Sequence, residues 1–540
     1  MRGERRGAVL VLGVLVVSAV LGGIYGPAVR ATASSADELK DAVSQFTNVL
    51  AVVQQNYAVP VDTDKALYEG AIPGMLRVLD PHSTFFDPQA YALLREDQRG
   101  EYYGVGMTIA PDRVNQNETE VLAPMVGTPA FRAGLKPADV ILKVDGKSTD
   151  GLTTPEVADL LKGPKGTNVT ISVHREGSDA PIDFTVMRDE IPKHSVDLAF
   201  MLRPGIGYIK LSGFNETTDS EMTDALKDLD ATSLDGLVLD LRGNPGGLLQ
   251  EAIAVSDKFL DKNQLIVSDH GRSSPEKRYY AVSGNRGVTA PLVVMIDGGS
   301  ASAAEIVTGS IQDHDRGLVV GEQSFGKGLV QSVSELSEDT GLALTIARYY
   351  TPSGRLIQRD YKDISLYDYL YNHKTPAPTE VKLTDGGRQV TGGGGITPDV
   401  VVAKPKPNDF QTDLYRHNVF YPYSNPLSVG GFATSYLGGH PDVTRSFEAD
   451  DAVMADFRKY LDKVGVKYTD ADITANLYWI KHMIKVEVFT WEFGLNDGYK
   501  VELENDPQVD KAVESLPQAR ALYENVRKII AQRTTEDPGQ

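Results

Sequence analysis

The chain has 540 residues and a formal net charge of −20, with 74 acidic and 54 basic side chains. Hydrophobic cores stop growing at roughly 250 to 300 residues, so we expect two to four domains. The negative charge would repel a phosphate backbone, which excludes nucleic acid as an expected partner. Because the sequence contains no cysteine, it can form neither disulfides nor thiolate-based catalytic or metal sites.

The N-terminal segment is typical of an export signal. Three arginines precede an apolar run over residues 8–24, which is followed by small residues. The run is close to the ~20 residues needed to cross a bilayer, and Ala31-Thr32-Ala33 could serve as a cleavage site, so removal and retention as a membrane anchor both stay open. We therefore expect an exported protein, periplasmic or extracytoplasmic, with residues 1–36 as a signal peptide or anchor.

The next two segments differ in the periodicity of their apolar residues. Residues 37–99 carry apolar side chains at helical spacing, which predicts a helical lead-in. Residues 100–188 change to short alternating strands separated by glycine and proline turns. One helix is embedded there, because Thr153-Thr154-Pro155-Glu156 combines a threonine cap, an early proline and an acidic residue.

In the rest of the chain, strands and helices first alternate and helices then dominate. Apolar runs at 237–241 and 292–296 predict strands of an α/β core that occupies residues 189–404. A polar stretch at 360–391 is typical of a surface insertion, and residues 405–540 form a helix-rich C-terminal region. The expected fold class is therefore a multidomain protein that combines α+β and α/β parts.

A turn rich in small residues, at 297–306, is the first candidate for a catalytic site. It reads D-G-G-S-A-S-A-A-E-I, leaves an apolar strand and enters an alanine-rich helix. Such a turn exposes small side chains and directs backbone N–H groups at one spot, as an oxyanion requires. A glycine- and serine-rich loop that only caps the helix is the alternative.

A serine nucleophile needs a base, and a lysine can serve if it is desolvated. Lys327 lies in a glycine-lined loop at 321–328, where partial burial would lower its pKa. The same octet imitates a phosphate-binding P-loop, but it ends in Gly328 where a hydroxyl should bind magnesium. The following residues alternate like a strand and offer no helix N-terminus, so nucleotide binding is disfavoured.

Together these motifs resemble the carboxyl-terminal processing peptidases, also called tail-specific proteases. The main matches are S-A-S-A-A-E-I at 300–306 and F-G-K-G-L-V-Q at 325–331. The resemblance spans residues 79–399, and its further motifs are L-D-P-H-S at 79–83, Y-G-V-G at 103–106, D-L-R-G-N-P-G-G at 240–247, Y-Y-T-P-S-G-R at 349–355 and G-I-T-P-D at 395–399.

The resemblance implies a serine endopeptidase that uses a Ser/Lys dyad and no cofactor. It places the nucleophile at Ser302 and the general base at Lys327, with Gln331 orienting the lysine. It also implies an oxyanion hole formed by the N–H groups of Gly246 and Ala303.

A second acidic and histidine-containing stretch leaves several alternatives open. Some relatives use an additional carboxylate at the position of Asp313, although a helix-capping or surface role fits equally well. His314 is the one candidate for an ordinary Ser-His arrangement, and the resemblance assigns it no role. The run Asp313-His314-Asp315 also suggests metal, but three adjacent residues cannot converge from one helix face, so we expect no metal site.

Residues 100–188 resemble a PDZ domain, which binds an extended C-terminal peptide at a sheet edge and holds its carboxylate with loop N–H groups. That loop falls on Tyr103, Gly104, Val105 and Gly106. The expected partners are therefore protein or peptide substrates with a free C-terminus. A β-rich module that only packs against the core is the alternative for this segment.

For the whole chain, the rival to a peptidase is a non-catalytic PDZ scaffold of the cell envelope. Such a scaffold would have no reason to carry both serine and lysine motifs. The sequence leaves open the physiological substrate, whether the PDZ domain activates or inhibits, and whether the protein forms a homo-oligomer.

Overall fold

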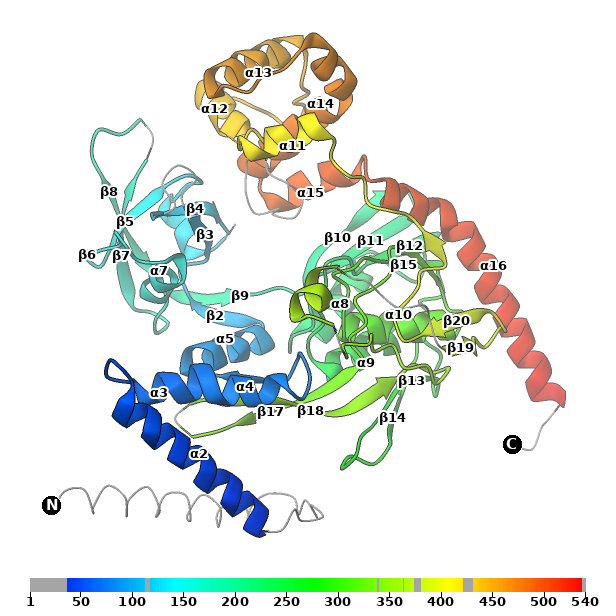
Figure 1. The fold of residues 1–540 in the computed structure, drawn as a ribbon. Helices are drawn as coiled ribbons and strands as arrows, with labels where there is room; N and C mark the ends of the chain where they lie inside the picture. The colour runs from blue at the N-terminus through cyan, green and yellow to red at the C-terminus, as the bar shows by residue number, and fades with distance from the viewer. Residues whose placement is uncertain are drawn as a thin grey trace. The chain divides into compact units, whose positions relative to one another are not determined.

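The computed structural model of the protein is shown in Figure 1. It describes residues 36–111, 117–125, 127–175, 177–337, 339–362, 364–372, 380–420 and 431–536. All but the last residue of the signal or anchor predicted at 1–36 therefore lies outside the described residues. None of the helices in these ranges has the length and hydrophobicity that a membrane crossing requires. The chain divides into two compact units.

The smaller unit contains the helical lead-in together with the segments 270–276 and 331–347. The apolar stripe of its first helix is exposed, as Leu39 and Val49 illustrate. Strand β1 (Thr84–Phe86) follows the helices and pairs antiparallel with β18 (Gly341–Tyr350). The helices are α2 (Ala36–Asn56), α3 (Thr63–Lys65), η1 (Ala66–Ala71) and α4 (Ile72–Arg77).

The larger unit begins with α5 (Pro88–Arg99) and continues into a small antiparallel β module. Strand β7 (Asn168–His174) shows why a sheet forms there, because Val169, Ile171 and Val173 alternate into a buried core while their neighbours face outward. The predicted helix is α7 (Thr154–Leu161), which Thr153 and Glu156 close with a capping box. Strand β2 (Glu101–Gly104) pairs with β9 (Asp189–Pro192) next to this module.

The sheet of the module has the order β3-β4-β5-β7-β8, with β6 paired to β5, so β3 is an edge strand. Its elements are β3 (Met107–Pro111), β4 (Thr119–Pro124), α6 (Pro129–Ala133), β5 (Val140–Val144), β6 (Lys147–Ser148), β7 (Asn168–His174) and β8 (Ile182–Met187).

The second part of the larger unit is an α/β core around a six-stranded sheet with the order β10-β11-β12-β15-β16-β21. All neighbouring strands are parallel except the β10–β11 pair. Parallel strands covered on both faces are apolar throughout, which is why β15 reads L-V-V-M-I. The strands are β10 (Val196–Arg203), β11 (Ile206–Leu211), β12 (Gly236–Asp240), β15 (Leu292–Ile296), β16 (Leu318–Gly321) and β21 (Val400–Val401).

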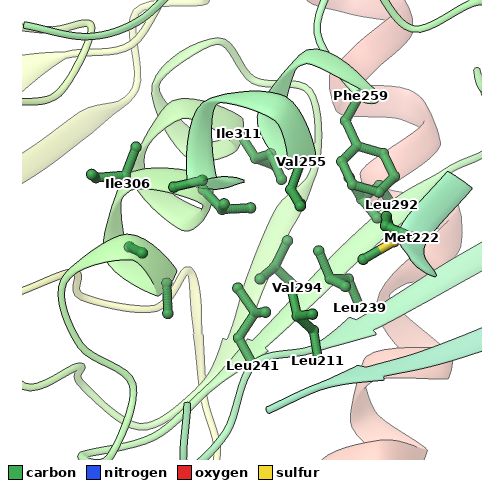
Figure 2. Close-up of a cluster of buried hydrophobic side chains, with 14 of the residues drawn as sticks. Leu211, Met222, Leu239, Leu241, Val255, Phe259, Leu292, Val294, Ile306 and Ile311 are labelled. Atoms are coloured by element: carbon green, nitrogen blue, oxygen red, sulfur yellow. The ribbon is translucent and has the colours of Figure 1, made fainter. Parts of the chain in front are cut away.

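Helices cover both faces of this sheet. On one face, Leu239 and Val294 pack against Val255 and Ile306 of the covering helices (Figure 2). These helices are α8 (Thr218–Asp228), α9 (Leu249–Asp257) and α10 (Ala303–Asp313). On the other face, Val293 and its neighbours share a core with the last helix of the chain, α16 (Pro507–Glu536). The C-terminal helix is thus part of the core, which the sequence pattern did not reveal.

The rest of the larger unit consists of two hairpins, a short helix and a helical bundle. The hairpins are β13 (Leu265–His270) with β14 (Lys277–Tyr280) and β19 (Glu380–Leu383) with β20 (Gln389–Gly392). Helix η2 (Asp368–Asn372) and the second hairpin fall within the predicted insertion. The bundle has its own aromatic core around Phe420, Phe432 and Phe457. Its helices are α11 (Asp409–Arg416), α12 (Gly431–Gly439), α13 (Asp451–Val464), α14 (Asp470–Phe493) and α15 (Leu495–Leu503).

Candidate active site

Ser302 lies where strand β15 ends and helix α10 begins, at the carboxyl edge of the parallel sheet. Its backbone has a φ of 55° and a ψ of −113°, a conformation that costs a non-glycine residue ~1–3 kcal/mol. The side chain is partly exposed, whereas Ala301 and Ala303 on either side are buried. Ala303 is the first residue of the helix, so its N–H has no acceptor within the helix and contributes to the positive helix end.

Asn244 and Ser300 tie the turn of Ser302 to the loop that follows strand β12. The Ser300 hydroxyl donates to the carbonyl of Leu241 at 2.8 Å, and the N–H of Ala301 donates to the carbonyl of Asn244 at 2.9 Å. Both Asn244 and Ser300 are fully buried. The loop that contains the glycine-rich D-L-R-G-N-P-G-G motif therefore lies directly beside the serine.

Glu305 connects the serine turn to the lysine loop. One of its carboxylate oxygens accepts the N–H of Ser302 and the N–H of Lys327, each at 2.8 Å. The two backbone nitrogens are therefore no farther apart than twice that distance. The other oxygen accepts the hydroxyl of Ser324 and the N–H of Gly326. Four donors thus converge on one fully buried side chain.

The electrostatics of Glu305 reflect two opposing effects. Burial raises its pKa above the ordinary value, while the four hydrogen bonds favour the charged form and lower it. Three of the four donors are backbone N–H groups, which can only donate, so these contacts favour the carboxylate form. Glu305 is therefore a hydrogen-bonding hub between the two predicted catalytic loops.

Tyr349, from strand β18, braces the lysine loop. Its hydroxyl donates to the carbonyl of Lys327. Its own N–H donates to the carbonyl of Gly328 at 3.0 Å. Burial, and after it the charge of Glu305, raises the pKa of Tyr349 well above its ordinary value, so the phenol stays neutral.

Gly246 lies against the turn that carries Ser302. A Cβ at this position would come within 2.7 Å of the Cβ of Ser302 and 2.9 Å of the nitrogen of Ala303, and the φ of +98° also favours glycine. The N–H of Gly246 donates to the side-chain oxygen of Asn244 at 2.8 Å. An oxyanion would therefore have to share this donor with Asn244.

Gln331 belongs to the smaller unit, together with the L-D-P-H-S motif. Its amide nitrogen donates to the carbonyl of His82. Asp80 shapes this turn by accepting the N–H groups of His82 and Ser83, each at 2.8 Å. The L-D-P-H-S turn is thus an anchor for the Gln331 side chain.

Asp313 and His314 lie at the opposite end of α10 from Ser302. Asp313 is eleven positions after Ser302, which corresponds to about 16 Å along the helix axis. Asp313 is buried and pairs with Arg355 at 2.7 Å, and it also accepts the N–H of Ser353 at 3.0 Å. These contacts give it a role in holding the Y-Y-T-P-S-G-R turn.

Both ring nitrogens of His314 already have partners, because they contact Asp385 and the carbonyl of Leu265, each at 2.7 Å. The geometry therefore does not support His314 as the base for Ser302. Across the described ranges, no group of three or more acidic or histidine residues is arranged to hold a metal ion.

The PDZ-like loop connects β2 to the edge strand β3. The carbonyl of Val105 accepts the N–H of Ala130 at 2.8 Å, and the carbonyl of Gly106 accepts the hydroxyl of Thr128 at 2.7 Å. In the part of the chain that the structure describes, the N–H groups of Val105 and Gly106 donate to no acceptor. The left-handed conformation lies at Gly106, with a φ of +77°, and not at Gly104.

Comparison with known proteins identifies this arrangement. A model of peptidase family S41 matches residues 205–365, and a PDZ domain model matches residues 120–175. The chain is 38% identical over 373 residues to the carboxy-terminal-processing protease of Bartonella bacilliformis, which covers 68% of this chain and 77% of that protein. The chain belongs to the carboxy-terminal processing proteases of peptidase family S41.

Other members of this family match over similar lengths. The carboxy-terminal processing protease CtpA of Bacillus subtilis is 36% identical over 308 residues, which is 57% of this chain and 65% of that protein. Among solved structures, the photosystem II D1 C-terminal processing protease has 30% identity and a TM-score of 0.36, and the match covers 67% of this chain and 87% of that one.

Membership of family S41 makes the chain a serine-type peptidase with a PDZ domain, which confirms the predicted family and fold class. It excludes the non-catalytic scaffold. The P-loop alternative also fails, because the lysine loop leads into strand β17 (Leu329–Glu335) and not into a helix.

Three residues of this carboxy-terminal processing protease escaped the sequence analysis: Asn244, Glu305 and Tyr349. Glu305 had a visible signal, since a serine followed three residues later by a glutamate is the pattern of a capping box. Asn244 and Tyr349 stand inside the glycine-rich and Y-Y-T-P-S-G-R motifs, but nothing local indicated which atoms they contact.

Proposed function

We propose that this protease hydrolyses peptide bonds with Ser302 as nucleophile and Lys327 as general base, on substrates that its PDZ domain selects by their free C-terminus. The observation that carries the dyad is the shared carboxylate oxygen of Glu305, which accepts the N–H groups of both residues. A second side chain, Tyr349, donates its hydroxyl proton to the carbonyl of Lys327.

The chemistry follows from the roles of these groups. The neutral amine of Lys327 takes the proton of the Ser302 hydroxyl while the oxygen attacks the substrate carbonyl. The resulting oxyanion lies at the N-terminus of α10, where Ala303 and Gly246 are the proposed N–H donors. Lys327 then gives its proton to the leaving amine, and water hydrolyses the acyl-enzyme. In this proposal Gln331 orients Lys327, whereas Asp313 contributes only by stabilising the fold.

Substrate selection rests on the loop from Tyr103 to Gly106. Its carbonyl groups at Val105 and Gly106 are bound by the domain itself, and the neighbouring N–H groups can meet a terminal carboxylate. The edge strand β3 begins directly after this loop, so an extended peptide can add to the sheet beside helix α7.

We also propose domain boundaries for the chain and its cellular location. Residues 37–99 precede the PDZ domain at 100–188, the catalytic core occupies 189–404, and the helix-rich region follows at 405–540. The arginines and the apolar run within residues 1–36 support export, with membrane attachment if this segment is retained.

The test compares cleavage of one unfolded polypeptide that carries either a free or an amidated C-terminus. Ser302→Ala and Lys327→Ala should each abolish cleavage without additive losses, because nucleophile and base act as one unit. Amidation should slow cleavage about 10- to 100-fold, since the loop donors lose a charged partner. A Lys327→Ala enzyme that stays active while His314→Ala is dead would overturn the dyad. Equal rates for both substrates would overturn C-terminal selection alone.

A further inference from the structure

The side chain of Tyr369 is buried, although it belongs to helix η2 in the segment that the sequence predicted as a surface insertion. It is 2% exposed, whereas its neighbours Tyr367 and Tyr371 are 66% and 68% exposed. Its ring meets the ring of Phe325 edge-on, with 5.6 Å between the two ring centroids. Because Phe325 is the first residue of the F-G-K-G motif, part of the insertion packs directly against the loop of Lys327.

Arg359 connects Tyr369 to the residues that precede the lysine. Its guanidinium packs against two aromatic rings, 4.4 Å from the ring centroid of Phe325 and 4.6 Å from that of Tyr369. The guanidinium also donates to the backbone carbonyl of Tyr369. The backbone N–H of Arg359 donates to the carbonyl of Gly326 at 2.9 Å. Since the arginine is buried, its contacts with the rings are stronger than they would be in water.

Gln358 makes a similar connection to the residue that follows the lysine. Its amide oxygen accepts the N–H of Gly328 at 2.8 Å. Its amide nitrogen donates to the phenol oxygen of Tyr369 at 3.1 Å, and the glutamine side chain is buried as well. Residues on both sides of Lys327 are therefore held by groups that Tyr369 contacts.

The loop needs such support, because a glycine stands on each side of Lys327. Glycine has more conformational freedom to lose on folding than any other residue, and Gly326 adopts a φ of +88°. The loop is joined to the serine turn through Phe325, whose N–H donates to the carbonyl of Ser300 at 2.9 Å. A displacement of about 1 Å at a catalytic group can cost roughly 100-fold in rate, so contacts that fix this loop affect the base directly.

We propose that Tyr369 is a positioning residue of the catalytic site: its buried ring holds the lysine loop where the amine of Lys327 reaches the Ser302 hydroxyl. Tyr369 acts through Arg359 and Gln358 and takes no part in the proton transfer. This inference rests on the proposed dyad, and it gives the inserted segment a role in catalysis.

The test is Tyr369→Leu, which removes the ring and the phenol and leaves an apolar side chain in the core. The rate constant for modification of Ser302 by a fluorophosphonate, and kcat for peptide cleavage, should each fall about 10- to 100-fold. KM should change little, because the proposal gives Tyr369 no contact with substrate. A purely structural role would lower the fraction of enzyme that reacts and leave the rate constant of the folded fraction unchanged.

The matched control is Tyr371→Leu, which makes the same change on the same helix at an exposed ring that contacts Tyr367 at 5.2 Å. It should keep the rate constant of the wild type. Tyr369→Phe keeps the ring and loses the bond to Gln358, so it should recover most of the rate. If Tyr369→Leu does not fold, Arg359→Lys replaces it, because lysine keeps the charge but lacks the planar group that packs on both rings. The same fall in the rate constant is expected.

A wild-type rate constant in folded Tyr369→Leu, or in Arg359→Lys where the first variant does not fold, would overturn the inference and leave the dyad intact. An equal fall in Tyr371→Leu would also overturn it, since the effect would not come from the buried ring. If the wild type does not react at Ser302, or if Lys327→Ala reacts as fast as the wild type, the dyad fails and the inference falls with it.

Discussion

Replacement of Glu305 by glutamine tests the central claim that one carboxylate assembles the active site. Glutamine has nearly the same shape but only one accepting oxygen. Each carboxylate oxygen of Glu305 accepts two donors, so the amide nitrogen of the variant would face two donors in a buried site. A buried donor without an acceptor costs ~1–3 kcal/mol, so we expect a total loss of about 2 to 5 kcal/mol.

This loss should divide between stability and catalysis, because the hub holds the fold and also sets the distance between Ser302 and Lys327. We expect Glu305→Gln to lower the thermal midpoint by several degrees and to reduce kcat by about 100-fold or more in the folded fraction. The assay pairs thermal unfolding with the rate of fluorophosphonate reaction at Ser302.

The matched control for this substitution is Asp399→Asn. Asp399 also accepts a backbone N–H, that of Val319 at 2.8 Å, and it pairs with Arg388 at 2.5 Å. In the described part of the chain its partners are Val319, Arg388 and Gln312, none of which lies in the serine or lysine loop, so the variant should lose stability yet react normally once folded. If Glu305→Gln and Asp399→Asn showed the same kcat, the carboxylate would only stabilise the fold, and the reasoning about positioning would be refuted.

Three further predictions concern pH and the PDZ loop. Cleavage should rise with pH, because Lys327 must be neutral to accept a proton, and an acidic optimum in a folded enzyme would contradict a lysine base. Burial, and after it the charge of Asp506, raises the pKa of the Glu502 carboxyl in the folded protein to about 7. The ionised side chain therefore destabilises the fold. This penalty is absent below the pKa of the unfolded chain and is complete once the pH has risen through the folded pKa. Glu502→Gln should therefore stabilise the protein by about 2 to 3 kcal/mol at pH 8 and by almost nothing at pH 4, as urea unfolding would show. Gly106→Val should weaken cleavage of free C-termini, because its φ is +77° and a Cβ would lie 2.4 Å from Thr128, while the fluorophosphonate rate stays that of the wild type.

Much of the fold could be predicted because its signals are local. The apolar run at 292–296 became a central strand, and the cap at Thr153 began a helix as expected. The position of α16 could not be predicted, because an apolar stripe does not specify which sheet it will cover. Leu516 of this helix fills the space next to Gly236, more than two hundred residues earlier in the chain. Only the assembled sheet defines that contact.

The residues of the candidate site also fall into those that the sequence predicted and those that it did not. Ser302 and Lys327 stood in recognisable motifs, and their loops meet in the structure. Glu305 carried the local pattern of a helix cap, but its bonds to the loop around Lys327 connect residues that are 22 positions apart. The role of Tyr349 depends on a strand that returns from still farther along the chain. Contacts between loops that are far apart in the chain cannot be read from the spacing of residues in the sequence. The roles of Glu305 and Tyr349 were therefore not predicted.

The backbone strain at Ser302 explains why the hydrogen bonds of Glu305, which the sequence did not reveal, matter for function. A positive φ at a serine costs ~1–3 kcal/mol, so the turn would relax unless other interactions oppose it. Hydrogen bonds to a charged group contribute ~1.5–3 kcal/mol each, and Glu305 forms one with the N–H of Ser302. The same carboxylate is fully satisfied only when the lysine loop is also in place, because three of its four donors come from Ser324, Gly326 and Lys327. The strained turn of Ser302 and the loop of Lys327 therefore stabilise each other through Glu305.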